Sequence, residues 1–373
     1  MKFSISTVLV LVLTSLTVQA SPSSPRTDEA LFVRSATQEI DRIAREDGFS
    51  GAILLARNGV PILRVAEGLQ DRQRQRPNRA DTKFPIESVT KQFTATAILL
   101  LEQRGQLKLT DSISRYYPDM PPALPPITIA QLLTHSSGIV DCKSCGDSDF
   151  LSYKDYVAKS LQTDLAFQPG TGMLYSNAGY GLLAIAIEKI SGLTYAEFLQ
   201  QHFFSPLRLT NSGDGKDAQM MAHGYFCPSG PESCQEGTGA NLEKMAGFNG
   251  VHSTVDDMLR WTRDLRQGAL LSEQSRQEMF HDYGHGYGFG WYLSDKMGRK
   301  VIWHTGSDGH AGYSSVVEVF PDDQVTVIAL ANSTGLSHGK ATLTIDRKPV
   351  TIPASTVREV VEQIETMYFE SSR

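Results

Sequence analysis

The sequence lacks any run of lysines or arginines, and only 20% of its residues are charged. Its formal net charge at pH 7 is -6, so no basic patch is available to neutralise the phosphates of a nucleic acid, and we expect no nucleic-acid partner. Internal repeats and low-complexity tracts are also missing. With 373 residues, 40% of them hydrophobic, the chain can bury a sizeable core. Its ligands are therefore expected to be small.

Apolar runs long enough to cross a membrane are missing beyond the N-terminus. The N-terminus has Lys2, a short apolar stretch over residues 8–16 and a small-x-small ending at Ala20. This pattern is typical of a secretory signal peptide over residues 1–20, whereas a membrane anchor, the competing interpretation, needs a longer and uninterrupted apolar run. No cysteine near the cleavage point could take a lipid. Residues 21–373 are therefore predicted to form a periplasmic or secreted domain without a membrane span.

Cysteines are few: Cys142 and Cys145 lie in one loop, and Cys227 and Cys234 lie in another. An even number in an exported chain predicts disulfides. Zinc bound by these thiolates is the alternative, but the spacing between Cys227 and Cys234 is wider than zinc sites usually have, so we expect no metal. The proline-glycine turn over residues 228–231 favours a local bridge there, although a bridge between the two loops stays open.

The first part of the mature chain predicts a helix followed by a hairpin. Residues 30–46 have the apolar spacing of an amphipathic helix. Residues 51–56 and 60–66 are apolar runs around Asn58 and Gly59, which supply the positive φ angles of a tight hairpin turn. We expect the first strands of an antiparallel sheet here.

The pattern then changes twice along the chain. From residue 127 to about residue 265, short helices are predicted with caps at Thr128, Asn177 and Ser253. Strand-like segments follow over residues 287–292, 300–304, 314–320 and 324–331, and a last amphipathic helix over residues 356–369 could cover the sheet. The predicted fold class is α/β (α+β). The sheet part covers about residues 28–105 and 285–373, and a mainly helical insertion covers about residues 106–284.

Ser88 and Lys91 are the first candidates for chemistry. They share one face of a helix that is predicted to open at Pro85 and to continue as an apolar, alanine-rich stripe. A serine hydroxyl becomes a nucleophile when a base removes its proton, and a lysine whose pKa is lowered by burial can do this. The helix start also directs N–H groups toward negative charge that develops on an acyl substrate. Ser-x-x-Lys also occurs by chance, so a capping serine beside a solvated lysine is the alternative at this point.

Two further segments carry polar groups that could line the same cleft. Tyr175 and Asn177 precede a predicted helix, where the phenol could relay a proton and the amide could hold a substrate carbonyl. A helix cap and a packing tyrosine would explain the same two residues. The tripeptide at residues 304–306, His-Thr-Gly, ends a predicted strand, which could pair with an extended acyl-peptide while glycine permits close approach. Neither segment establishes a site alone.

The three motifs in this order and context resemble the penicillin-recognising serine hydrolases, which carry Ser-x-x-Lys at a helix start, Tyr-x-Asn between helices and Lys-or-His-Thr-Gly on a strand. Further segments resemble the class C β-lactamase and DD-peptidase branch of that superfamily; they are residues 132–139, 168–170, 287–291 and 304–312. The resemblance spans roughly residues 30–335 and implies a β-lactamase/transpeptidase-like fold.

Carried over to this sequence, the resemblance makes Ser88 the acylated nucleophile, Lys91 its proton acceptor and Tyr175 the group that passes a proton to the leaving group. The implied substrate-binding residues are Asn177, His304, Thr305, Gly306 and Ser307. The backbone N–H groups of Ser88 and Ser307 would form the oxyanion hole. Whether the lysine or the tyrosine is the base stays open, because coupled groups titrate as a unit. Neither a metal nor an organic cofactor is expected. His135 is expected to have a structural role in its turn.

His304 is a departure from the class C pattern, where lysine is usual. A lysine is a permanent cation that attracts a substrate carboxylate, whereas a histidine is mostly neutral near pH 7. We therefore expect an exported serine hydrolase that forms a covalent acyl-enzyme on an amide or ester, as a DD-peptidase-like carboxypeptidase or an esterase. The alternatives are a β-lactamase of class C type and a low-turnover penicillin-binding or scaffolding protein. The substrate and the oligomeric state stay open.

Overall fold

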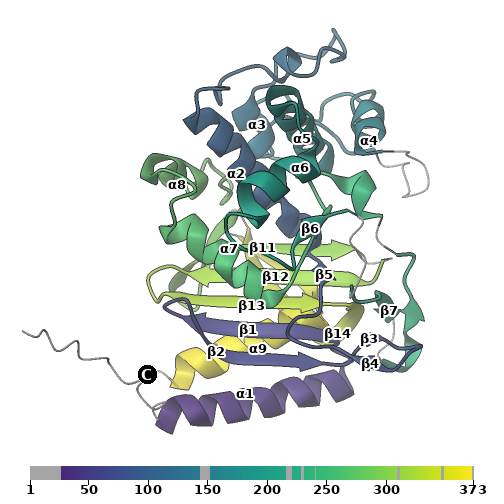
Figure 1. Cartoon of the computed structure of the whole chain (residues 1–373), viewed down its shortest axis with the longest axis vertical. Helices are drawn as coiled ribbons and strands as arrows, with labels where there is room; N and C mark the ends of the chain where they lie inside the picture. Colours follow the sequence, from purple (N-terminus) through teal and green to yellow (C-terminus); the bar gives the residue numbers. More distant parts are fainter. Residues whose placement is uncertain are drawn as a thin grey trace, which may run out of the picture.

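The computed structural model describes residues 27–142, 152–215, 221–227, 231–239, 241–308, 311–345 and 348–371. These residues form a mixed α+β fold built on a six-stranded sheet with the strand order β10-β11-β12-β13-β1-β2 (Figure 1). All neighbouring strands of this sheet run antiparallel. The predicted antiparallel sheet flanked by helices is therefore confirmed, while the predicted signal peptide lies outside the described residues.

The α-helices of the described chain are α1 (Thr27–Glu46), α2 (Thr90–Gln103), α3 (Ile129–Leu133), α4 (Tyr153–Ser160), α5 (Asn177–Ser191), α6 (Tyr195–Leu199), α7 (Val255–Gln267), α8 (Glu273–Met279) and α9 (Thr356–Ser371). The main-sheet strands are β1 (Gly51–Arg57), β2 (Val60–Glu67), β10 (Tyr292–Lys296), β11 (Arg299–Asp308), β12 (Tyr313–Phe320) and β13 (Val325–Ala331). The remaining strands are β3 (Leu69–Asp71), β4 (Arg76–Pro77), β5 (Phe84–Pro85), β6 (Gly213–Asp214), β7 (Tyr225–Cys227), β8 (Gln235–Glu236), β9 (Val251–Ser253), β14 (Ser333–Ile345) and β15 (Lys348–Ser355).

Alternating side chains of β1 enter two different cores. Leu54 packs in the core shared with α2, α5 and α7, whereas Ile53 and Leu55 pack in the core shared with α1 and α9. The hairpin between β1 and β2 turns as predicted at Asn58 and Gly59, whose φ angles are 53° and 73°. The sheet is thus buried on both faces, with α1 and α9 on one side and the catalytic candidates on the other.

Two helices that are buried on nearly all sides form the centre of the larger core. Every residue of α2 from Thr90 to Leu101 is buried, and so is every residue of α5 from Ala178 to Ile187. The Phe93 ring of α2 stacks on the Trp261 ring of α7 with centroids 3.9 Å apart. The helices α3, α4, α5 and α6 gather at the end of the molecule away from α1 (Figure 1). The start of α2 is therefore held between this helical part and the sheet.

The predicted helix caps are correct for one helix and displaced by one residue for two others. Thr128 caps α3 in a capping box with its third residue. The cap of α5 is Ser176 instead of Asn177, and the cap of α7 is Thr254 instead of Ser253. The hydroxyl groups of Ser176 and Thr254 accept hydrogen bonds from backbone N–H groups of the first turn. The displacement leaves the Asn177 side chain available for another contact.

Two strand predictions near the C-terminus needed correction. Residues 287–291 are not a strand, because Gly286 and Gly290 adopt positive φ angles and only Tyr287 bridges to Tyr292. The strand β11 continues to Asp308, so residues 304–306 lie inside it. The hairpin of β14 and β15, which lies outside the main sheet, was not predicted from the sequence.

Cys227 and Cys234 form a disulfide, which confirms the local bridge favoured by the turn between them. Both sulfur atoms are used in this bond, so this pair supplies no thiolate to a metal. Cys142 is also disulfide-bonded, and Cys145 lies outside the described residues.

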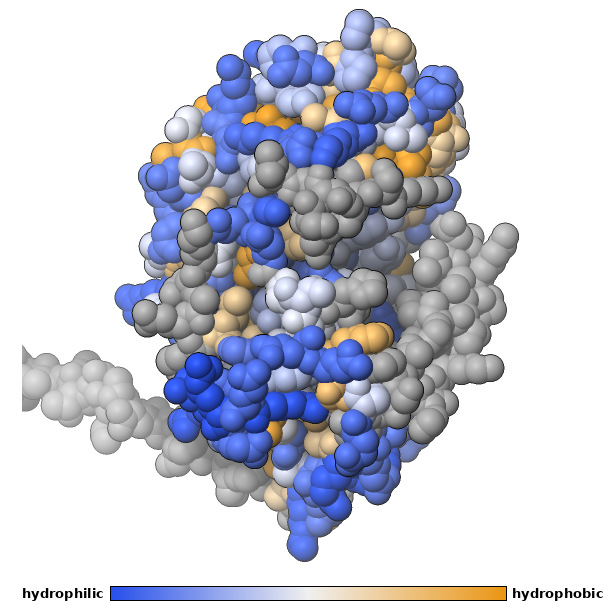
Figure 2. All heavy atoms as spheres, turned by 90° about the vertical axis from the view of Figure 1, so that its right-hand side faces the viewer, coloured by the Kyte–Doolittle hydropathy of each residue, from blue (hydrophilic) through white to orange (hydrophobic). Residues whose placement is uncertain are grey.

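The length and hydropathy of the described helices bear on whether any of them could cross a bilayer. Within the described ranges, no helix combines the length and the apolar character needed to cross a bilayer. The face shown in Figure 2 is predominantly hydrophilic, and its apolar side chains gather mainly in the upper, helical part.

A buried cluster of charges joins α9 to the sheet. Lys296 of β10 lies 2.9 Å from a carboxylate oxygen of Glu318 on β12 and 2.5 Å from one of Glu365 on α9. Both glutamates are at most 2% exposed. Burial alone would lower the pKa of Lys296, but the two carboxylates outweigh it and raise the pKa above its usual value.

Replacing Lys296 by methionine should destabilise the fold by about 3 kcal/mol at pH 8, because two buried carboxylates would lose their cation. Without the lysine, the folded-state pKa of each carboxyl should lie above its unfolded value, so the lost stability should return partly as the pH falls toward 5. Urea unfolding of both proteins at pH 5 and pH 8 measures this. A variant as stable as the wild type at pH 8 would contradict the expectation.

Candidate active site

Ser88 lies on a sharp turn that the surrounding strands hold in place. It belongs to the short 3-10 turn Glu87–Val89 before α2, so the helix begins at Thr90, later than predicted. Glu87 has a φ of 51°, a conformation that reverses the chain direction and that residues other than glycine rarely adopt. The backbone of Ile86 donates to Val251 of β9 at 2.9 Å and accepts from the Ser315 hydroxyl at 2.7 Å. Ser88 itself is half-buried and therefore reachable.

Lys91 is completely buried beside this serine. Its Nζ donates to Ser88 Oγ at 3.1 Å, to Asn177 Oδ1 at 2.7 Å and to the Phe248 carbonyl at 3.1 Å. Burial lowers its pKa to about 7, against the opposing effect of Asp141 and Glu87. The alternative of a solvated lysine is therefore wrong. Near neutral pH a substantial fraction of this amine is neutral and able to take a proton.

Tyr175 faces the same amine from the segment before α5. The Lys91 Nζ lies 4.7 Å from the centre of the Tyr175 ring. Burial raises the pKa of Tyr175 well above its usual value, and a hydrogen bond with Ser88 opposes this effect only in part. The phenol thus keeps its proton at neutral pH. Of the two candidate bases, only the lysine has a pKa near 7, so only the lysine is partly deprotonated at neutral pH.

Asp141 was missed by the sequence analysis, although it organises the segment that carries Tyr175. Its carboxylate accepts from the Ser176 hydroxyl and from the backbone N–H groups of Asn177 and Ala178, each at 2.9 Å. A carboxylate is favourable at a helix N-terminus because the N–H groups there carry partial positive charge. The available signal was an acidic residue just after the landmark at residues 132–139.

Asn249 is the second missed residue. Its Oδ1 accepts a hydrogen bond from Ser88 Oγ at 3.1 Å, and the preceding Phe248 carbonyl accepts from Lys91. The loop before β9 therefore completes the acceptors around the serine and the lysine. Its position depends on the pairing of β9 with β5 and β6, which links segments far apart in the sequence.

The strand β11 lies directly against the turn that carries Ser88. A Cβ atom at Gly306 would lie 2.3 Å from the carbonyl oxygen of Ile86 and 2.7 Å from Glu87 Cβ. Gly306 is therefore required by close approach of the protein's own backbone. Thr305 is half-buried, and Ser307, which pairs with Ser314 of β12, is exposed at the next position of the strand.

His304 differs from the expected substrate-facing group, because its side chain is buried and turned toward the protein interior. Its Nε2 lies 3.3 Å from the Tyr287 hydroxyl, and its Nδ1 lies 2.7 Å from the Thr305 carbonyl. Burial and the nearby Lys91 lower its pKa to about 3, so the imidazole is neutral. His135 is likewise buried, in agreement with a structural role.

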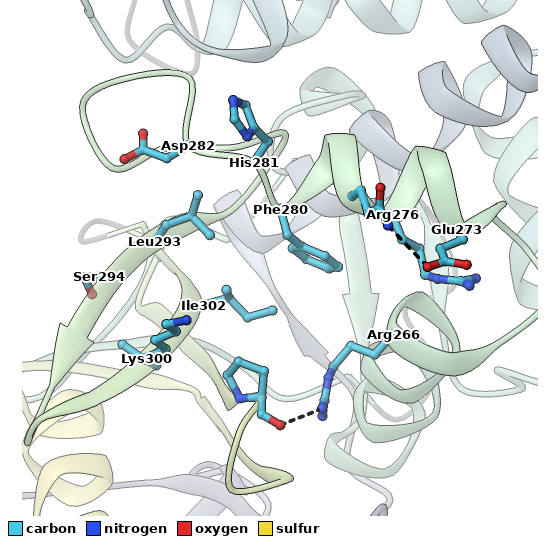
Figure 3. A pocket seen from close by; sticks show the side chains of 13 residues that line it. Arg266, Glu273, Arg276, Phe280, His281, Asp282, Leu293, Ser294, Lys300 and Ile302 are labelled. Atoms are coloured by element: carbon cyan, nitrogen blue, oxygen red, sulfur yellow. Dashed lines mark hydrogen bonds between the residues drawn. The ribbon is translucent and has the colours of Figure 1, made fainter.

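A separate pocket of about 650 Å³ lies between α7, α8 and the strands β10 and β11 (Figure 3). Phe280, Leu293 and Ile302 supply apolar walls, and Arg266 at the rim donates to the Pro321 carbonyl. None of the predicted site residues lines it. In the part of the chain that the structure describes, no group of His, Cys, Asp and Glu is placed to hold a metal.

The family model described as Beta-lactamase matches residues 37–348, most of the chain. The chain belongs to the Beta-lactamase family. The fold is accordingly that of β-lactamases and penicillin-binding proteins, and the resemblance to the penicillin-recognising serine hydrolases is confirmed. Members of this family act by acyl transfer through a serine.

Relatives in this family carry several different names. The chain is 30% identical to Penicillin-binding protein 4* of Bacillus subtilis, over 78% of this chain and 70% of that one. It is 28% identical to Esterase EstB of Burkholderia gladioli, over 78% of this chain and 86% of that one.

Solved structures of the same fold include a penicillin-binding protein from Bacillus halodurans, with 25% identity, a TM-score of 0.72 and coverage of 88% of this chain and 98% of that one. D-amino acid amidase from Ochrobactrum anthropi SV3 shares the fold at 22% identity, with a TM-score of 0.75 and coverage of 93% and 100%.

Lys91→Met should raise the free energy of unfolding by about 1 kcal/mol at pH 7 while it abolishes turnover. The folded-state pKa of Lys91 lies below the unfolded value, so the folded wild type binds fewer protons between about pH 7 and 10 and gains stability as the pH rises. Methionine should remove this pH dependence. Urea unfolding from pH 7 to 10 measures it, with Lys296→Met as the matched change of opposite sign. A Lys91→Met variant that unfolds more easily would contradict the expectation.

Asp141→Asn should shift the acid limb of the kcat/KM profile from its wild-type position near pH 7 to a lower pH, because Asp141 raises the pKa of Lys91. The variant should also lose about 1 kcal/mol of stability through weaker capping of α5. The pH profile and thermal unfolding give the two readouts. An acid limb that moved upward would show that another group is being titrated.

Proposed function

We propose that this chain is an exported serine hydrolase that forms a covalent acyl-enzyme at Ser88 on an ester or amide substrate. The observation that supports this most directly is the 3.1 Å contact between Ser88 Oγ and a buried Lys91 whose pKa lies near 7. The proposal of export rests on the sequence pattern of residues 1–20.

In the proposed acylation step, neutral Lys91 takes the proton of Ser88 as Oγ attacks the substrate carbonyl carbon. The negative charge on the carbonyl oxygen would be held by the backbone N–H groups of Ser88 and Ser307. The tetrahedral intermediate then expels the leaving group, which receives a proton through Tyr175. In deacylation, Lys91 takes a proton from the attacking water, the bond between the acyl carbon and Ser88 Oγ breaks, the acid is released, and Lys91 returns the proton to Ser88 Oγ.

Asn177 and Asn249 hold the reacting groups in this scheme. The amide oxygen of Asn177 accepts a hydrogen bond from Lys91, and the amide oxygen of Asn249 accepts one from Ser88. Positioning of this kind lowers the barrier because the nucleophile and the base already share a geometry close to that of reaction.

His304 bears on the substrate class. Since the imidazole is neutral and buried, the strand motif supplies no cation to a substrate carboxylate. This favours esters and amides that are uncharged near β11, of esterase or amidase type, over β-lactams and over peptides with a terminal carboxylate. The names of EstB and D-amino acid amidase are consistent with that choice.

Ser88→Ala should abolish turnover across a panel of p-nitrophenyl esters, a chromogenic cephalosporin and D-Ala-D-Ala peptides, because no other hydroxyl can replace the nucleophile. Ser294→Ala is the matched control: Ser294 is also half-buried, but it bonds Trp303 and lines the separate pocket. The control should keep wild-type rates. Unchanged activity of Ser88→Ala would remove the proposal.

A penicillin adduct separates the proposal from the β-lactamase alternative. Any adduct that penicillin forms on Ser88 should persist for hours in mass spectrometry, whereas an efficient β-lactamase would release it at once. Failure of both penicillin and a fluorophosphonate probe to label the protein would favour a non-catalytic binding protein.

A further inference from the structure

Three buried side chains form a continuous chain of hydrogen bonds behind the candidate site. His135, Tyr287 and His304 are each at most 1% exposed. The Tyr287 hydroxyl lies 3.3 Å from His135 Nε2 and 3.3 Å from His304 Nε2. The chain joins the turn at His135, in the helical part, to strand β11 of the sheet.

The two ends of this chain determine where the imidazole protons lie. The backbone N–H of Ser176 can only donate, and it points to His135 Nδ1 at 3.1 Å, so this nitrogen has no proton and Nε2 carries one. The carbonyl of Thr305 can only accept, and it lies 2.7 Å from His304 Nδ1, so this nitrogen carries the proton and Nε2 has none. The two histidines are thus neutral and in opposite tautomers.

Tyr287 is the group that these tautomers require between them. Its oxygen accepts from His135 Nε2–H, and its proton is donated to His304 Nε2. The neighbouring Tyr180 hydroxyl donates its proton to the Leu133 carbonyl at 2.8 Å, so it has no proton to give to Tyr287. One arrangement of protons satisfies the whole chain.

The charged and titratable groups around the chain favour the same neutral state. Burial lowers the pKa of both histidines, and Lys91 of α2 lowers both further. The other facing groups are phenols: the Tyr175 ring lies 4.3 Å from that of His135, and the Tyr292 ring lies 5.3 Å from that of His304. Burial raises the pKa of each phenol, so these groups stay uncharged as well.

We propose that Tyr287 is a positioning residue that bridges His135 and His304, whose opposite tautomers the backbone of Ser176 and Thr305 sets, and thereby holds both walls of the acyl site. His135 anchors the segment of Tyr175 and Asn177 through the backbone of Ser176. His304 anchors β11, next to the position of Ser307, and its ring stays turned away from the substrate. The catalytic consequence rests on the proposed function, whereas the proton arrangement does not.

The proton arrangement is tested by nitrogen-15 NMR of the imidazoles in the wild-type protein, with signals assigned by their loss in His135→Gln and His304→Asn. We expect His304 protonated on Nδ1 and His135 protonated on Nε2, with neither signal titrating between pH 5 and pH 8. An Nε2–H tautomer of His304, or titration of either ring in that range, would overturn the proposal.

Tyr287→Phe tests the catalytic consequence. The phenylalanine ring keeps the edge contact with Tyr292, whose ring centre is 4.7 Å away, but it offers no hydroxyl. We expect kcat to fall by up to about 100-fold with KM little changed, because misplaced groups slow the reaction more than they weaken binding. The tautomers should persist, because the backbone of Ser176 and Thr305 sets them, but the Nε2 resonances of both histidines should shift once their hydroxyl partner is gone. Tyr292→Phe, which leaves the hydrogen-bond chain intact, should keep wild-type kcat.

The outcomes of this experiment are distinguishable. A Tyr287→Phe variant with wild-type kcat would refute the positioning role. A wild-type protein that shows the expected tautomers but turns over no ester or amide would refute the proposed function alone. If Tyr287→Phe failed to fold, the tautomers of the wild-type protein would still decide the proton arrangement.

Discussion

The candidate site depends on one buried amine. An ammonium group in a protein interior is costly, and the structure accommodates Lys91 by giving its Nζ three oxygen acceptors and by lowering its pKa to about 7. The burial is produced by α2 and α5, which are buried on nearly all sides and enclose the amine together with Phe248. A chemically ordinary lysine has its pKa lowered to about 7 because the groups around it exclude water.

Two nearby carboxylates partly oppose the lowering of the Lys91 pKa by burial. Asp141 and Glu87 raise the pKa of Lys91, and the Asp141 carboxylate also accepts hydrogen bonds from groups at the start of α5. The same carboxylate therefore orients the segment of Tyr175 and tunes the lysine. Lys296, outside the site, has its pKa shifted in the opposite direction from that of Lys91, because two carboxylates raise it. Its ion pairs join α9 to the sheet.

The relatives and structural neighbours of this chain have different names: a penicillin-binding protein and an esterase among the relatives, and a D-amino acid amidase among the proteins of the same fold. The fold alone therefore does not select the substrate. In this chain, the neutral and inward-turned His304 removes one source of positive charge beside β11. The strand motif here acts as part of the frame of the site, through the hydrogen bonds that run to Tyr287 and His135.

By itself, the sequence determined whatever short-range patterns encode: the hairpin at Asn58 and Gly59, the alternation of apolar residues, the local disulfide, and the spacing of Ser88 and Lys91. Tertiary structure alone decided the burial of Lys91, the contacts of Asp141 and Asn249, and the hairpin of β14 and β15 outside the main sheet. Turn chemistry and periodicity act between residues close in the chain, so a sequence displays them directly. A pKa or a hydrogen-bond partner depends on which distant segments exclude water and face each other, and packing of the whole chain sets that.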